Sequence, residues 1–282
     1  MTEGQVVAWA ACFAAGAGTA APLAALRIAR PASAPVRVNW RGARVPVVLG
    51  APLAAGTAGG LALGWWAFPG QAGDFAAAVV LAAGLMWAAG EWDDRRGDEA
   101  ERGFKGHLKA AASGRLTGGM VKIAAGVVAG LASGAVVARG WDIALAALLV
   151  AASANLVNLL DRAPGRAGKA SLVLLVLVTI LGPFQWALAS AGVTGALVAL
   201  LIPDLAERGM LGDAGANLLG AVAGLGLAGA LSTGGEIVVL GGLLALNLAS
   251  ERWSFSEVIE RNRALRVIDA MGRRRALGRR PK

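Results

Sequence analysis

The sequence is poor in cysteine, histidine, tyrosine and charge. Cys12 and His107 are the only residues of their types among 282, and tyrosine is absent. A single cysteine excludes an intramolecular disulfide and a cysteine-based zinc site. Charged residues make up 16% of the chain, whereas soluble globular domains carry about 25%. An ordinary soluble fold is therefore not expected.

Apolar residues make up 56% of the chain, and its mean hydropathy is +0.61. They run in blocks close to the ~20 residues that cross a ~30 Å hydrocarbon core. The predicted fold class is all-α, a polytopic membrane bundle of about nine (eight to ten) transmembrane helices. The predicted spans are residues 4–26, 47–67, 74–92, 118–138, 141–160, 169–183, 185–203, 214–232 and 235–250. The sixth and seventh are short, so a broken or re-entrant pair is the alternative there.

Positive charge is distributed very unevenly between the two sides of this arrangement. With the N-terminus outside, the inside segments are 27–46, 93–117, 161–168, 204–213 and 251–282. All 27 Lys and Arg residues except Arg139 lie in these segments or at the inner end of a span. Cytoplasmic loops carry such an excess, which predicts an outside N-terminus and a cytoplasmic C-terminus. The net charge of +9 thus fits membrane loops, and nucleic acid is not an expected partner.

The chain divides into a transmembrane domain, residues 1–250, and a basic tail, residues 251–282. The tail has an irregular amphipathic pattern that includes Trp253, Val258 and Leu265. A cytoplasmic helix of this type lies on a membrane surface and is attracted to anionic lipid.

One inside segment begins with two adjacent carboxylates, Asp93 and Asp94. Two such groups repel each other unless a cation lies beside them. Oxygen ligands of this kind suit Mg²⁺, which commonly shares its coordination with substrate phosphates. The nearby side chains of Lys105, Lys109 and Lys122 would neutralise those phosphates. The alternative is a solvated helix end with local ion pairs.

Two further segments place polar groups beside apolar spans. Asn155, Asn158 and Asp161 are three residues apart, so they face one side of a helix. Polar groups within a span are costly and indicate function, with interhelical hydrogen bonding as the alternative. Asp213 stands in a glycine-flanked turn before another span, where it is either a ligand or a helix cap.

Together these segments resemble the polyprenyl-phosphate N-acetylhexosamine-1-phosphate transferases. That family includes the phospho-MurNAc-pentapeptide translocase and bacterial enzymes that use UDP-GlcNAc. Its Asp-Asp pair matches Asp93-Asp94, and its Met-Gly-Asp-x-Gly segment matches Leu211 to Gly215. Its Asn-x-x-Asn-Leu-x-Asp-Gly segment matches Asn155 to Asp161. Its first cytoplasmic loop resembles the stretch with Asn39, Arg41, Gly42 and Pro46. Order, spacing and sidedness agree from about residue 36 to 225.

The resemblance implies a Mg²⁺-dependent transferase, with Mn²⁺ as a substitute metal, in the bacterial cytoplasmic membrane. It would transfer a sugar 1-phosphate from a UDP-sugar to a polyprenyl phosphate and release UMP, for envelope glycan or glycolipid synthesis. The implied catalytic residues are Asp93, Asp94 and Asp161, and the implied metal ligands are Asp94 and Asp213. The implied substrate-binding residues are Asn39, Arg41, Lys105, Lys109, Lys122, Asn155, Asn158, Arg162 and Arg166. The polyprenyl phosphate and the nucleotide sugar are the expected partners, and a homodimer is left open.

The chain departs from the family in three ways. Pro164 stands where the family usually has an acid or an amide, the family's His-rich motif is missing, and the spans are fewer. These departures predict a donor smaller than UDP-MurNAc-pentapeptide. They also leave open a non-catalytic descendant that binds a lipid carrier or scaffolds envelope proteins. An intramembrane prenyltransferase is a weaker alternative, because Asp94 and Asp98 would supply one acidic motif but Asp213 has no acidic neighbour in sequence.

Overall fold

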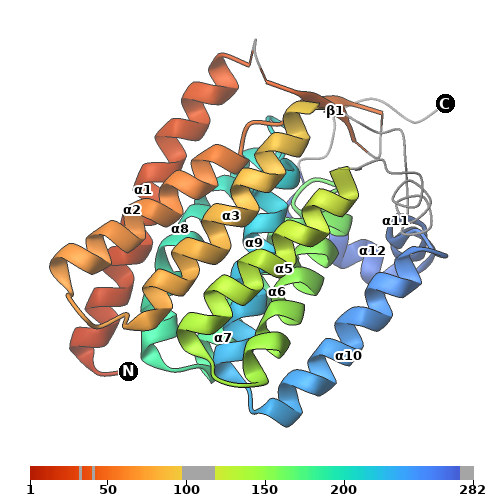
Figure 1. The fold of residues 1–282 in the computed structure, drawn as a ribbon. Coiled ribbons are helices and arrows are strands. Elements are labelled where there is room, and N and C mark those ends of the chain that lie inside the picture. The colour runs from red at the N-terminus through yellow and green to blue at the C-terminus, as the bar shows by residue number, and fades with distance from the viewer. Residues whose placement is uncertain (32–33, 40–41, 97–117, 274–282) are drawn as a thin grey trace.

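The computed structural model describes residues 1–31, 34–39, 42–96 and 118–273. Helices form nearly all of it, which confirms the predicted all-α class (Figure 1). The long helices are α1 (Glu3–Ala29), α2 (Gly50–Ala67), α3 (Asp74–Arg96), α5 (Gly118–Val137), α6 (Asp142–Leu160), α7 (Arg166–Leu181), α8 (Phe184–Leu205), α9 (Gly212–Ala230) and α10 (Thr233–Ser250). Two short helices, α11 (Phe255–Arg261) and α12 (Arg263–Ala270), belong to the tail. Each predicted span overlaps one of the long helices.

Six of the described helices are long and apolar enough to cross a membrane: α1, α3, α5, α6, α8 and α10. The helices α2, α7 and α9, which overlap the other three predicted spans, are not among these six. Helix α7 has 16 residues, and at 1.5 Å per residue it is about 24 Å long, less than the ~30 Å of a hydrocarbon core. The structure therefore supports a membrane protein with six candidate spans.

Helix α9 is the centre of the bundle. Every residue from Gly212 to Leu227 is buried, and the helix packs on α6 and α3 over most of its length. Small residues make this close packing possible. A Cβ atom built at Gly220 would lie 2.5 Å from Cα of Ala154, so the α6 and α9 backbones are in contact there.

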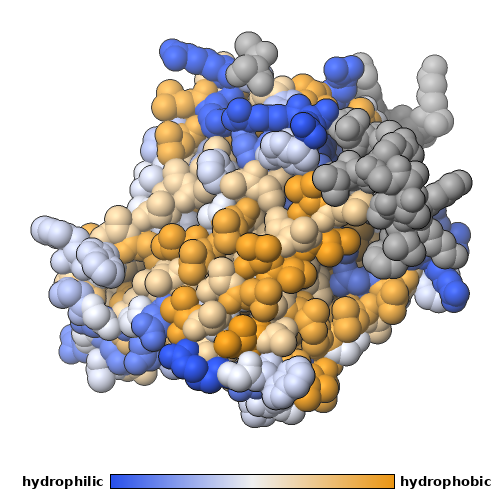
Figure 2. All heavy atoms as spheres, in the orientation of Figure 1, coloured by the Kyte–Doolittle hydropathy of each residue, from blue (hydrophilic) through white to orange (hydrophobic). Residues whose placement is uncertain are grey.

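The outer surface is largely apolar. Hydrophobic residues cover the middle of the face shown in Figure 2, and hydrophilic residues gather toward its ends. Helices at the periphery expose many large apolar side chains, among them Val80, Val128, Val173, Ile180, Val238 and Leu248. Soluble monomers rarely expose apolar surface on this scale, whereas lipid acyl chains would cover it.

A two-stranded hairpin, which the sequence did not predict, connects α1 to α2. Strands β1 (Val36–Val38) and β2 (Arg44–Pro46) pair antiparallel, with Arg37 opposite Val45. The backbone N–H of Met210 donates to the carbonyl of Pro46 at 2.9 Å, so the α8–α9 connection is fixed beside the hairpin. The N-terminus lies at the end of the bundle opposite the hairpin (Figure 1).

Candidate active site

Three predicted site carboxylates meet where α3 ends and α9 begins. Gly90 allows this approach, because a Cβ atom there would lie 2.5 Å from both N and Cα of Ala214. One turn later, α3 presents Asp93 and Asp94 to the first turn of α9, which carries Asp213. Segments about 120 residues apart in sequence are thereby joined, as the hydrogen bonds of Asp94 show.

Asp94 binds the N-terminus of α9. Its carboxylate accepts hydrogen bonds from the backbone N–H groups of Asp213 at 3.1 Å and Ala214 at 3.0 Å. These amides have no partner within their own helix, and the helix dipole favours a negative charge beside them. Gly212 adopts φ +66° at this turn, and a Cβ atom on it would lie 2.6 Å from Oδ2 of Asp94. From the sequence, Asp213 was expected to be either a metal ligand or the cap of this helix. The structure shows that Asp94 caps α9 instead.

Two cationic side chains lie between the carboxylates. Nη2 of Arg37 is 3.0 Å from Oδ1 of Asp94 and 3.2 Å from Oδ2 of Asp213. Nζ of Lys122 is 2.6 Å from Oδ2 of Asp93 and 2.5 Å from Oδ2 of Asp213. Lys122 was a predicted phosphate ligand, and the structure brings it to the aspartates. Arg37 was not predicted, because only the hairpin brings the first inside segment across to α3 and α9.

Asp161 follows the C-terminal end of α6, near enough to Asp94 and Asp213 for their charges to act on it. Burial raises the pKa of Asp161 well above its ordinary value, and the nearby carboxylates of Asp204, Asp213 and Asp94 raise it further. Burial alone would lower the pKa of Arg37, but the charges of Asp213 and Asp94 outweigh it and raise that pKa.

The charge balance of the cluster suits a divalent cation. Asp93, Asp94 and Asp213 supply three carboxylates, and two cationic side chains, Arg37 and Lys122, pair with them. One formal negative charge is left over among these described side chains when all three acids are ionised; Asp161, whose pKa is raised, is not counted. No group of three or more His, Cys, Asp or Glu side chains among the described residues is arranged to hold a metal by itself. Mg²⁺ does not require one, since it is usually bound by one or two carboxylates, waters and substrate phosphates. The residues present therefore fit Mg²⁺ bound together with a phosphate.

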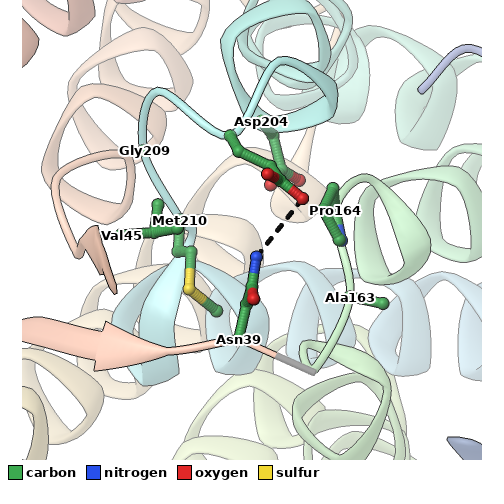
Figure 3. Close-up of a pocket in the computed structure, with 8 residues that line it drawn as sticks. Asn39, Val45, Ala163, Pro164, Asp204, Gly209 and Met210 are labelled. Carbon is green, nitrogen blue, oxygen red and sulfur yellow. Dashed lines mark hydrogen bonds between the residues drawn. The ribbon is translucent and has the colours of Figure 1, made fainter. Parts of the chain in front are cut away.

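A small pocket opens between the hairpin and the α8–α9 connection (Figure 3). Asn39, Pro164, Asp204 and Glu207 are among its lining residues, and its cavity volume is about 10 Å³. Nδ2 of Asn39 donates to Oε1 of Glu207 at 3.3 Å, and Oδ1 of Asn39 accepts from the backbone N–H of Ala43 at 3.0 Å. The predicted residue Asn39 thus shapes the pocket wall. Binding sites for small molecules usually measure ~300–1,000 Å³, whereas this pocket has room for about one water molecule. Its walls would have to separate before a nucleotide sugar could enter.

Asp204 is a buried acid that was not among the predicted site residues. It lies at the end of α8, and its Oδ2 atom accepts a hydrogen bond from the backbone N–H of Gly165 at 3.2 Å. The available signal was a carboxylate directly after Pro203 at the inner end of a predicted span. Asp204 and Pro164 line the same pocket.

The polar residues predicted on one face of α6, Asn155, Asn158 and Asp161, lie in two different environments. Nδ2 of Asn155 donates to Oδ1 of Asn247 on α10 at 2.5 Å. Asn247 in turn donates to the carbonyls of Ala152 and Leu243. This is the interhelical hydrogen bonding that the sequence had left as the alternative. Asn158 is half-buried one turn closer to Asp161.

The predicted donor-binding arginines also differ in their surroundings. Arg162 is exposed. Arg166 is buried, and its guanidinium binds Asp269 and Ser256 of the tail. The predicted substrate ligands Arg41, Lys105 and Lys109 lie outside the described residues.

Comparison with known proteins gives no matching family model and no matching curated protein.

Proposed function

We propose that the chain is a phosphoglycosyl transferase that acts on a UDP-sugar and a polyprenyl phosphate. The observation that carries the proposal is the convergence of Asp93, Asp94 and Asp213 around Lys122 and Arg37. A site that transfers a phosphoryl group works mainly by positioning and by neutralising charge. Carboxylates for a metal and cations for phosphate oxygens supply both.

The reaction exchanges one phosphorus–oxygen bond for another. An oxygen of the lipid phosphate bonds to the sugar-bearing phosphorus, the pyrophosphate bond breaks, and UMP leaves. Bound Mg²⁺ would offset the charge that develops on the leaving group. Asp213 and Asp93 are the better placed to hold it, because their oxygens pair with side chains that can rotate away. Both oxygens of Asp94 accept hydrogen bonds from the backbone. This revises the ligand pair Asp94 and Asp213 that the resemblance implies.

The remaining residues of the site would bind and orient the substrates. Lys122 and Arg37 would turn from the carboxylates to phosphate oxygens, where a charge-assisted hydrogen bond is stronger than a neutral one. Asp93 would orient or deprotonate the lipid phosphate. Asn158, Asp161 and the exposed Arg162 would contact the donor. The apolar outer surface would accommodate the polyprenyl chain.

The direct test is to incubate the purified protein with polyprenyl phosphate, Mg²⁺ and a panel of UDP-sugars, and to measure UMP. UDP-GlcNAc or another small UDP-hexose should release UMP, and EDTA should stop the reaction. UDP-MurNAc-pentapeptide should not react, because the family's His-rich motif is missing and Pro164 replaces an acid or an amide. Formation of the MurNAc-pentapeptide lipid would contradict the proposed donor class.

A second candidate is a carrier-binding protein without turnover. Two observations favour it. Lys122 and Arg37 already pair with the carboxylates that would hold a metal, and Pro164 replaces an acid or an amide of the resembled family. If every donor fails to release UMP while polyprenyl phosphate still binds, this candidate replaces the transferase.

We also propose that all nine long helices lie within the bilayer, with the N-terminus outside and the site facing the cytoplasm. In intact cells, a membrane-impermeant thiol reagent should label Trp141→Cys, which is exposed beside α6, and leave Arg162→Cys unlabelled. The unmodified chain is the control, because its single Cys12 is buried. Labelling of Arg162→Cys from outside would reverse the topology.

The tail is the proposed contact with anionic lipid. Helices α11 and α12 leave apolar side chains exposed, including Val258, Leu265 and Ile268, and Met271 directly after α12 is exposed as well. A surface-lying amphipathic helix buries such side chains at the level of the lipid head groups while its basic residues attract anionic lipid.

A further inference from the structure

The tail is attached to the bundle by a buried, bidentate ion pair. Nε and Nη2 of Arg166 each lie 2.9 Å from one carboxylate oxygen of Asp269, and Nη1 donates to Oγ of Ser256 at 2.9 Å. Arg166 is 6% exposed and Asp269 is 7% exposed. Burial alone would raise the pKa of Asp269, but Arg166 and Arg273 outweigh it and lower that pKa. Two buried partners in fork geometry form one of the stronger side-chain contacts available to proteins.

Two more cations strengthen this attachment. Nζ of Lys169 donates to the carbonyls of Ile268, Asp269 and Met271, at 3.1, 2.7 and 3.0 Å. The last carbonyls of a helix lack partners within it, so Lys169 caps the C-terminal end of α12. Arg273 pairs with Asp269 at 2.6 Å and donates from Nε to the carbonyl of Pro164 at 3.1 Å. We call Arg166, Lys169, Asp269 and Arg273 the tail clamp.

The tail clamp binds the same turn that forms one wall of the pocket. Residues 161–165 connect α6 to α7 without regular structure, and Ala163 and Pro164 line the pocket. Gly165 ends this turn at φ +70° and donates its N–H to Asp204. The turn is therefore held by Asp204 on the pocket side and by Arg166 and Arg273 on the tail side. Arg273 contacts the carbonyl of Pro164 directly, and Arg166 is two positions from Pro164 in the chain.

We propose that Asp269 and Arg166 are positioning residues for the donor pocket, so that docking of the tail fixes the wall against which the nucleotide binds. This inference rests on the proposed function for the identity of the ligand. It assigns Arg166 an indirect role in place of the direct contact that the resemblance implied, because all three guanidinium nitrogens already have protein partners. Coupling between two sites is reciprocal, so a nucleotide in the pocket should in turn hold the tail.

The test compares Asp269→Asn with Glu260→Gln in the full-length protein in detergent micelles. Glu260 is an exposed acid of the same tail, so its change is the matched control. Two measurements are made on each variant. One is amide hydrogen exchange of residues 161–168 and 263–273, and the other is the affinity for UDP with Mg²⁺ and for polyprenyl phosphate.

Asp269→Asn should speed exchange in both segments and weaken UDP binding about tenfold, within the usual range of coupling between sites. The affinity for polyprenyl phosphate should change less than about twofold, which separates a positioning effect from general loss of structure. In the unmodified protein, UDP should slow exchange of residues 263–273. Glu260→Gln should match the unmodified protein throughout.

Three results would overturn the inference: a tail that stays docked in Asp269→Asn, a freed tail with unchanged exchange in 161–168, or a freed tail with unchanged UDP affinity. If the unmodified protein binds no UDP, the proposed function is what fails, and exchange of residues 161–168 still decides whether the clamp holds the turn. Should Asp269→Asn not fold, Arg273→Gln removes the outer contact while leaving the pair of Arg166 and Asp269 in place.

Discussion

Replacing Asp213 by asparagine should lower the rate of UMP release about a thousandfold, which corresponds to roughly 4 kcal/mol of lost transition-state stabilisation. Asp213 is buried and faces both Lys122 and Arg37. The amide keeps the volume of the carboxylate and still accepts a hydrogen bond, so the fold should persist. What disappears is the negative charge that would hold the metal and the phosphate together.

The matched control is Asp74→Asn, the same chemical change at the exposed first turn of α3. Asp74 lies at the opposite end of α3 from Asp93 and Asp94, so its variant should keep full turnover. Thermal unfolding of both variants checks that neither change disturbs the fold. Full turnover in Asp213→Asn would remove the metal assignment and most of the case for catalysis.

Gly90→Ala should strongly destabilise the contact between α3 and α9 beside the aspartates. The new Cβ atom would lie 2.5 Å from backbone atoms of Ala214, and backbone atoms cannot rotate away as a side chain does. Helices α3 and α9 would separate, which would pull Asp94 from the N–H groups of Asp213 and Ala214. Overpacking costs ~1–3 kcal/mol, and hydrogen bonds to a charged group contribute about 1.5–3 kcal/mol. Alanine recovers at most about 1 kcal/mol of helix propensity, so the net loss should be roughly 2–4 kcal/mol.

Gly84→Ala is the control within the same helix, because a Cβ atom at Gly84 has nothing within 4 Å. This variant should be as stable as the unmodified protein or more so, by up to about 1 kcal/mol. Thermal unfolding in one detergent and UMP release should both be measured. Equal stability of the two variants would mean that the α3–α9 contact is looser than the structure shows.

The parts that the sequence predicts best depend on local pattern. Apolar blocks bounded by charge are sufficient to place the helices, since one block is one helix whatever it packs against. Asp93, Asp94 and Asp213 stand out because carboxylates are costly next to apolar spans, and the structure brings them together. The number of helices that cross the membrane does not follow as directly, because α7 is apolar but short.

The parts that the sequence misses depend on contacts between distant segments. Arg37 reaches Asp213 across 176 positions, and Arg166 reaches Asp269 across 103. No local pattern indicates which of many arginines finds a buried acid. Asn155 shows the same limit, since its periodicity indicated the face it shares with Asp161 but not the position of Asn247 on α10. A polar residue on a helix is visible in the sequence, whereas its partner is a property of the fold.

The glycines at the helix crossings also determine how this sequence can change over evolutionary time. A side chain at Gly192 would overlap the backbone of α2, and one at Gly195 would overlap the backbone of α1. Substitution there requires two helices to move at once, whereas the lipid-facing apolar residues can exchange with one another at little cost. Distant relatives with this fold should therefore share few residues on their outer surface and keep glycine at these crossings. Their kinship would be more visible in the spacing of small residues than in overall sequence identity.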